Sequence, residues 1–307
     1  MDKKNSKKIG VVLSGGTLRG AAHIGVLREL HRMGIEPAMI AGTSVGGLVA
    51  TMYGRGLSLN LLEEIVREFD GRKLLDISLP TFELMWAVLL FPLYYFRVLK
   101  HISQRVPPGF IVGAKFEAWL RKLIKITPTR LPIPHLITST DLLSGDAIVF
   151  YGATEQPHPL PRVQFVPMAD PALAIRASCS LPGVFLPREN APHLLVDGAL
   201  RNNLPIDLLH HLGCEKVIAV DLHKSQMDDH FKVSYLSVMD RMMDIMLDEL
   251  MEIRIGKYRP FVIRPNLDGV GWTTWDALTD AVEIGADATK AVRAQLFSYL
   301  LHSPGQE

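Results

Sequence analysis

The sequence predicts an α/β fold in which a mainly parallel sheet is sandwiched between helices. Three observations support this prediction. Short apolar, β-branched runs alternate with helical segments from the start of the chain. Glycine-bearing turns follow the first two of these runs. The 307 residues are 48% hydrophobic and 21% charged, the ordinary composition of a globular protein with a sizeable core.

The N-terminal part supplies two strand–helix units. Lys8–Ser14 is an apolar run that ends at two glycines and predicts a strand followed by a tight turn. Gly20–Met33 carries apolar residues at helical spacing and stops before Gly34, which predicts a helix with a glycine cap. Pro37–Ala41 predicts a second buried strand, and Val45–Tyr53 predicts the helix that follows it.

The same alternation continues through the rest of the chain. Further strands are expected at His135–Thr140, Ala147–Tyr151, His193–Val196, Lys216–Leu222 and Phe261–Arg264, and helices at Ala114–Ile124, Leu204–Leu212, Tyr235–Tyr258 and Trp275–Leu300. No internal repeat or Gly/Ser linker divides the chain, so we expect one domain over residues 8–300 after a basic tail at 1–7. Residues 59–134 differ in kind and predict a helical, partly hydrophobic insertion over one sheet edge.

Charge and cysteine content exclude several classes of protein. Lys and Arg number 33 against 32 Asp and Glu, and this balance argues against a nucleic-acid partner, which a basic surface would bind. Cys179 and Cys214 cannot form a disulfide framework, which indicates a reducing, cytoplasmic compartment. No metal-ligand spacing is present around them or around His210 and His211, so we expect neither a metal nor a cofactor.

The motif G-x-S-x-G occurs at Gly42–Gly46, between a predicted strand and a predicted helix. A strained strand-to-helix turn lifts the serine hydroxyl clear of the sheet, and the flanking glycines avoid Cβ clashes there. Ser44 is therefore a candidate nucleophile, and the alternative is a purely structural turn.

A glycine-rich turn at Ser14–Gly20 opens the first predicted helix. Such a turn directs several backbone N–H groups to one point, where they can hold a phosphate or an oxyanion. Dinucleotide binding would require a glycine at Thr17 and a carboxylate at the end of the next strand, and the sequence has neither. The Gly-Lys-Ser/Thr of phosphate-binding loops is also missing.

Asp197, followed by Gly198, ends the apolar run before it. A carboxylate at a strand end can act as general base, or it can form an Asx turn, and the residues themselves leave both readings open. His223 follows later in the chain, so that a Ser44–Asp197–His223 triad has the order of α/β hydrolases. The position of Ser44 after only the second strand argues against that triad. His23 is expected to pack or to make a local hydrogen bond.

With these motifs in order, the chain resembles the patatin-like phospholipase family. The blocks that carry the resemblance, beside the two motifs already described, are Gly20–Gly34, Asp170–Phe185 (DPALAIRASCSLPGVF), Asp197–Pro205 (DGALRNNLP), Val217–Leu222 and Ala281–Val292. Recognisable blocks cover about residues 8–58 and 135–292, and the segment between them corresponds to the variable part of the family.

The resemblance implies a lipid acyl hydrolase with a Ser–Asp dyad. Ser44 would be the nucleophile and Asp197 the residue that takes its proton, through an acyl-enzyme. Gly15, Gly16 and Thr17 would supply the amides of the oxyanion hole. The sequence departs from the family at Thr17, where glycine is common. A backbone N–H group is still present at this position, but the threonine side chain narrows the space through which a substrate approaches the loop.

The expected substrate is the carboxylic ester of a phospholipid or lysophospholipid. A general carboxylesterase or thioesterase, and a catalytically silent lipid-binding protein, are the alternatives. Arg19 would either hold a substrate phosphate or pair near the glycine loop. Met85–Phe96, an apolar run broken by Pro92 and too short to span a membrane, is either core or a surface for transient contact with the inner face of the membrane.

Overall fold

The computed structural model describes residues 8–77, 108–128, 133–222, 235–268, 270 and 275–302. The apolar run Met85–Phe96 and the candidate triad member His223 lie outside these residues, so the predictions that concern them remain predictions.

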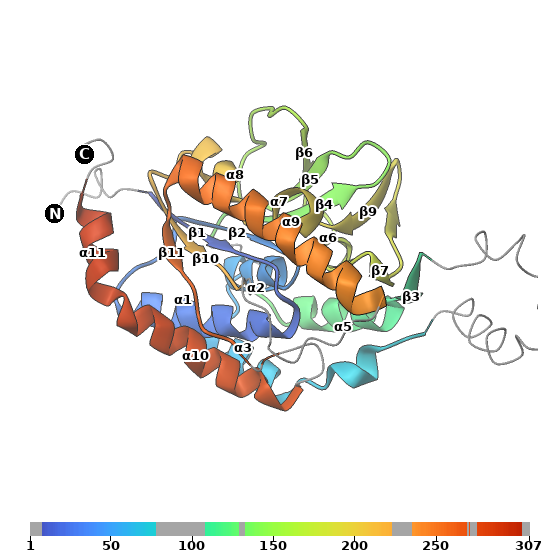
Figure 1. The fold of residues 1–307 in the computed structure, drawn as a ribbon, viewed down its shortest axis with the longest axis horizontal. Helices are drawn as coiled ribbons and strands as arrows, with labels where there is room; N and C mark the ends of the chain where they lie inside the picture. Colours follow the sequence, from blue (N-terminus) through green and yellow to red (C-terminus); the bar gives the residue numbers. More distant parts are fainter. Residues whose placement is uncertain are drawn as a thin grey trace, which may run out of the picture.

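A twisted, mostly parallel sheet forms the centre of the molecule (Figure 1). Within the described residues it has nine strands, seven of them in the order β11-β10-β1-β2-β4-β5-β6. Neighbours from β11 to β4 are parallel, whereas β5 and β9 run antiparallel to β4. The strands are β1 (Ile9–Leu13), β2 (Met39–Thr43), β4 (His135–Asp141), β5 (Ala147–Gly152), β6 (Val163–Pro167), β8 (Arg188–Asn190), β9 (His193–Asp197), β10 (Lys216–Val220) and β11 (Phe261–Ile263). A separate parallel pair joins β3 (Gly109–Ile111) to β7 (Gly183–Phe185).

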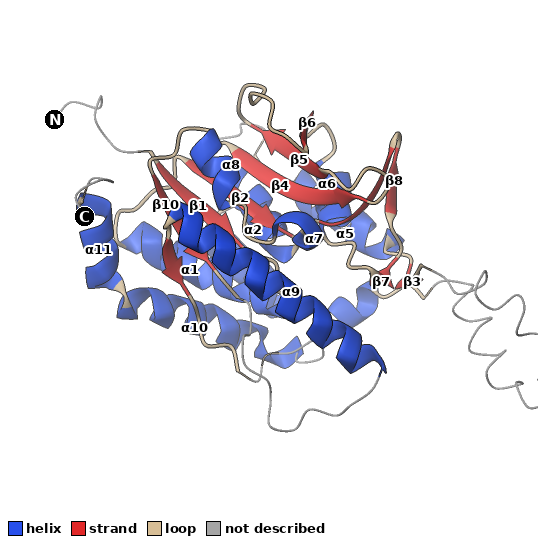
Figure 2. Ribbon diagram, turned by 45° about the horizontal axis from the view of Figure 1, so that its top comes forward, coloured by secondary structure: helices blue, strands red, loops and turns tan. Residues whose placement is uncertain are grey.

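Helices cover both faces of the sheet, which confirms the predicted fold class (Figure 2). Because successive side chains of a strand point to opposite faces, Val11 and Leu13 enter one core while Val12 enters the other. The larger core holds α1 (Ala22–Arg32), α2 (Val45–Gly54), α3 (Leu59–Glu68), α5 (Ala114–Lys125), α6 (Pro171–Ser178) and α10 (Leu278–Ala291). The smaller core lies under α8 (Ile206–His211) and α9 (Tyr235–Tyr258).

The predicted elements are present with modest shifts of their ends, and one predicted helix is divided. The helix expected over residues 20–33 begins as the 3-10 turn η1 (Thr17–Ala21) and continues as α1. The helix expected over residues 275–300 is three elements: the 3-10 turn η4 (Trp275–Ala277), α10, and α11 (Arg293–Leu301) after a break at Val292. The backbone leaves helical geometry at Val292 although no glycine or proline marks the break.

Several elements were not predicted at all. They are α3, η2 (Gly71–Leu74), β3, β6, α6, β7, β8 and the short α7 (Ala199–Asn202). The signal for α3 was present, since Ser58 caps this helix by accepting a hydrogen bond from the Leu61 amide. Within the segment predicted as an insertion, α3 packs against α1 and α10, and α5 packs against α6.

Helices α1 and α10 pack with their backbones in close approach. A Cβ atom built on Gly25 would lie 1.8 Å from the Val282 carbonyl oxygen, and one built on Gly285 would lie 2.1 Å from the Ala22 carbonyl oxygen. A side chain at either position could be accommodated only if one helix moved, because the atoms in its way belong to the backbone of the other helix. Glycine is therefore required on both sides of this crossing.

We expect Gly25→Ala to lower the free energy of unfolding by about 2–3 kcal/mol or more, because it overpacks the crossing. Gly256→Ala is the matched control: Gly256 is exposed on α9 with nothing within 4 Å of an added Cβ, so this variant should gain about 0.5–1 kcal/mol. Urea unfolding of the two variants measures both values. Similar free energies for the two variants would contradict the packing described here.

Candidate active site

The pairing of β4 brings two distant segments of the chain together. Strand β5 occupies one edge of β4 from His135 to Thr140, so β2 and β9 share the other edge. Along that edge Thr43 is the partner of Thr138, and Asp197 is the partner of Ser139. Because β2 and β9 run in opposite directions, their C-terminal ends meet there. The residue after Thr43 and the last residue of β9 are thereby placed side by side.

Ser44 occupies a strained turn between β2 and α2. Its φ of 54° and ψ of −127° lie in a region that residues with a side chain seldom adopt. The flanking glycines are sterically required: a Cβ on Gly42 would lie 2.4 Å from the backbone of Gly46, and a Cβ on Gly46 would lie 2.4 Å from the Leu13 carbonyl oxygen. The Ser44 amide donates to Ser178 Oγ at 2.7 Å. This is the geometry of a nucleophile elbow.

Asp197 is buried beside Ser44. Only 3% of its surface is exposed, its amide donates to the Ser180 carbonyl at 2.9 Å, and its Oδ1 accepts the Ala199 amide at 2.9 Å. Burial raises the pKa of Asp197 to about 6, although hydrogen bonds from the Ala199 amide and the Ser44 side chain act in the opposite direction. The structure thus brings together the two residues that the motifs single out.

The glycine loop borders the same site. A Cβ on Gly15 would lie 3.3 Å from the Cβ of Ser44, so the loop contacts the elbow directly. The Gly15 amide donates to Asn203 Oδ1 at 2.9 Å, which leaves it engaged within the protein. Gly16 precedes η1, and Thr17 has a φ of 52°. That left-handed conformation costs little for glycine, which explains in physical terms why glycine suits the position of Thr17.

Three hydrogen bonds hold the base of this loop in place. The Ser14 amide donates to the Val220 carbonyl at 3.0 Å, and Ser14 Oγ accepts the Leu222 amide at 2.9 Å. His23 Nε2 lies 2.8 Å from the Ser14 carbonyl oxygen. Burial lowers the pKa of His23 to about 4, so the ring is neutral and Nε2 donates to the carbonyl. The local hydrogen bond predicted for His23 is confirmed.

Arg19, Cys179 and His210, which the sequence also offers as candidates, each make contacts of their own. Arg19 donates through Nε to the Val270 carbonyl at 3.0 Å, at one side of the glycine loop. Cys179 is hydrogen-bonded to the Ser44 side chain, and burial raises the pKa of this thiol to about 12, so it stays protonated. His210 stacks on Tyr258 with ring centroids 5.5 Å apart.

Across the described parts of the chain, no group of three metal-ligating side chains is present, and no helix is both long and apolar enough for a bilayer span.

A groove of about 480 Å³ lies elsewhere, between α5, the C-terminal end of α6 and the segment Leu186–Glu189, which includes the start of β8. Arg121, Arg176, Arg188, Glu117 and Glu189 line it, whereas Ser44 and Asp197 do not. Its cations already have partners: Arg188 and Arg121 both pair with Glu117 at 2.8 Å, and Arg121 also pairs with Asp170. These ion pairs leave Arg121 and Arg188 engaged within the protein.

Sequence reasoning did not assign a role to Ser178, Ser180 or Asn203. Each makes a hydrogen bond to a candidate site residue: to Ser44, to Asp197 and to Gly15, respectively. The bonds of Ser178 and Asn203 join residues 134 and 188 positions apart. The available signal was their position in the blocks Asp170–Phe185 and Asp197–Pro205, which are rich in small polar residues at the end of an element.

Comparisons with known proteins identify the family of this chain and several relatives. The family model of the patatin-like phospholipases matches residues 11–210. An uncharacterized NTE family protein of Mycobacterium tuberculosis is 28% identical over 223 residues, which are 72% of this chain and 51% of that protein. The lysophospholipase NTE1 of Candida glabrata is 26% identical over 267 residues, which are 86% of this chain and 13% of that protein.

The fold is also similar to that of a solved structure. The crystal structure of VipD from Legionella pneumophila superimposes with a TM-score of 0.53 at 16% identity, covering 96% of this chain and 67% of that one. The chain spans about half of the length of the mycobacterial relative. The family model covers most of the sheet, the elbow and the strand that carries Asp197. The chain belongs to the patatin-like phospholipase family.

Proposed function

We propose that the protein hydrolyses carboxylic esters of lipids, with phospholipids or lysophospholipids as substrates, through a dyad of Ser44 and Asp197. The observation that carries this proposal is the meeting of a strained serine and a buried carboxylate at adjacent positions along β4. Family membership and the similarity to a protein named as a lysophospholipase support the substrate class.

The dyad has the properties that proton transfer requires. A carboxylate with a pKa of about 6 is largely ionised at neutral pH yet remains a stronger base than an exposed aspartate. It accepts a proton from Ser44 as the hydroxyl oxygen attacks the ester carbonyl carbon. The protonated Asp197 then gives that proton to the departing alcohol, and an acyl-enzyme on Ser44 results.

Water completes the cycle by the reverse sequence. Asp197 takes a proton from a water molecule, which attacks the acyl carbon, and Ser44 leaves with the proton returned from Asp197. Both tetrahedral intermediates carry an oxyanion. The Gly16 and Thr17 amides are its proposed donors, because the described residues offer these two amides no acceptor, whereas the Gly15 amide is engaged by Asn203.

Substitution of the dyad tests its role. We expect Ser44→Ala to abolish hydrolysis of a short-chain ester and Asp197→Asn to lower kcat by about 10²–10⁴-fold, because each removes one half of the proton transfer. Asp141→Asn is the matched control, since Asp141 is also a buried aspartate at a strand end, and it binds two residues of its own turn and, at the other end of β9 from Asp197, His193 and the Leu194 amide. Steady-state kinetics on folded protein measures the effect. Retained turnover in the Ser44 variant would exclude this residue as nucleophile.

The pH dependence of kcat/KM gives an independent test. The base must be ionised, so we expect activity to rise with pH through a single acidic limb near pH 6 and then to level off. If the catalytic aspartate were exposed to solvent, activity would instead rise with a midpoint near pH 4. A pH profile on a soluble ester between pH 4 and 8, with stability checked at each value, measures the limb. A limb near pH 4 would mean that the catalytic carboxylate is solvated, contrary to its burial here.

A further inference from the structure

The C-terminal turn of α6 contacts both halves of the proposed dyad. Ser178 is fully buried, and its Oγ accepts the hydrogen bond from the Ser44 amide at 2.7 Å. Two residues later, the carbonyl of the equally buried Ser180 accepts the hydrogen bond from the Asp197 amide at 2.9 Å. Cys179 lies between these two serines and is hydrogen-bonded to the Ser44 side chain. One short stretch of chain thus holds two segments that are far apart in the sequence.

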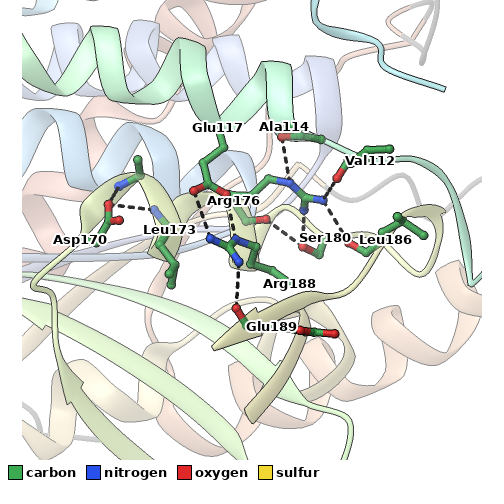
Figure 3. Close-up of polar contacts among 12 residues, drawn as sticks. Val112, Ala114, Glu117, Asp170, Leu173, Arg176, Ser180, Leu186, Arg188 and Glu189 are labelled. Atoms are coloured by element: carbon green, nitrogen blue, oxygen red, sulfur yellow. Dashed lines mark hydrogen bonds and ion pairs between the residues drawn. The ribbon is translucent and has the colours of Figure 1, made fainter. Parts of the chain in front are cut away.

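Arg176 anchors this turn from its other side (Figure 3). Its side chain, 2% exposed, donates to the carbonyls of Val112 at 2.7 Å, Leu186 at 3.0 Å and Gly113 at 3.2 Å. The same guanidinium donates to Ser180 Oγ at 2.5 Å, and Ser180 Oγ in turn donates to the Arg176 carbonyl at 2.8 Å.

This network makes the turn rigid. Burial lowers the pKa of Arg176, but a guanidinium stays charged in proteins, and backbone and hydroxyl oxygens here surround the charge. The planar fork of donors accepts little rotation while four acceptors are in place. The position of Ser180 is therefore fixed relative to α5, β3 and β7 as well as to α6.

We propose that the turn Arg176–Ser180 is a positioning element that fixes Ser44 and Asp197 relative to each other, and that Ser178 is the positioning residue of the nucleophile. This inference rests on the proposed function. It gives a role to the Asp170–Phe185 block beyond packing of the sheet.

The physical reason lies in the conformation of Ser44. A residue with a φ of 54° persists only if its surroundings determine it, and the hydrogen bond to Ser178 is made by the amide of that residue. Without the Ser178 hydroxyl, the amide loses its acceptor, and the elbow would relax toward a less strained turn. A displacement of about 1 Å at a reacting group costs on the order of 10² in rate.

The test compares Ser178→Ala with Thr289→Val. Thr289 is likewise fully buried, but its hydroxyl binds the Gly285 carbonyl within α10, away from the site. Both variants lose one buried hydroxyl. The measurements are the second-order rate of labelling by a fluorophosphonate probe, kcat and KM on a short-chain ester, the pH profile, and the melting temperature.

We expect Ser178→Ala to lower the labelling rate and kcat by about 10²-fold with KM nearly unchanged, whereas Thr289→Val should keep both rates within about twofold. The acidic limb should stay near pH 6, because the burial of Asp197, which raises its pKa, and the hydrogen bond from the Ala199 amide do not involve the Ser178 hydroxyl. Ser178→Thr, which keeps a hydroxyl, should recover part of the loss.

The outcomes separate this inference from the proposed function. Failure of the wild-type protein to react with the probe would overturn the proposed function itself. A reactive wild type with a Ser178→Ala variant that reacts at the same rate would overturn the positioning role alone. Equal rate losses in Ser178→Ala and Thr289→Val, in proportion to their loss of melting temperature, would also overturn it, because the effect would then be one of general stability.

Discussion

The chemistry that we propose for this protein depends on the pairing of a single strand, β4. One edge of β4 is shared by two strands that run toward each other, and their ends meet between Thr138 and Ser139. The side chains of this junction reinforce it, since Thr43 Oγ1 lies 2.7 Å from Thr138 Oγ1 and also donates to the Asn202 carbonyl at 2.8 Å. A shift of either strand by one residue would turn its side chains to the opposite face and separate Ser44 from Asp197.

The same junction has a cost in stability. Burial raises the pKa of Asp197 to about 6, above the value of an aspartate in the unfolded chain, so the folded protein binds the proton more tightly than the unfolded chain does. Below the pKa of Asp197 in the unfolded chain, the folded and unfolded states are both protonated at this residue, and it has no effect on the free energy of unfolding. As the pH rises from about 4 to about 6, the unfolded chain loses this proton first, and the free energy of unfolding falls by roughly 3 kcal/mol. Ser44 and Thr17, both at positive φ, add backbone strain. The surrounding sheet and its two cores must compensate for this local cost.

Local patterns gave much of the fold and the identity of Ser44, but not the contacts between distant segments. The elbow motif could be found because glycine, serine and glycine occur within five residues. Asp197 remained open between a base and a turn residue, because the pairing of β9 with β4 is not a property of its neighbours in sequence. Family resemblance, rather than residue pattern, selected the base. The roles of Ser178, Arg176 and Asn203 depend on contacts across 63 to 188 residues, and no local pattern encodes those contacts. The positive φ of Thr17 could not be predicted from the sequence either, because threonine seldom adopts this backbone conformation.

The central claim is that Ser44 is a nucleophile activated by the carboxylate beside it. Mass-spectrometric mapping of the protein after reaction with a fluorophosphonate probe tests this claim most directly. We predict one adduct per chain, on the peptide that contains Ser44, formed at a rate that falls when the pH is lowered below about 6. An adduct on a different residue, or reaction at Ser44 with no dependence on pH in this range, would contradict the account.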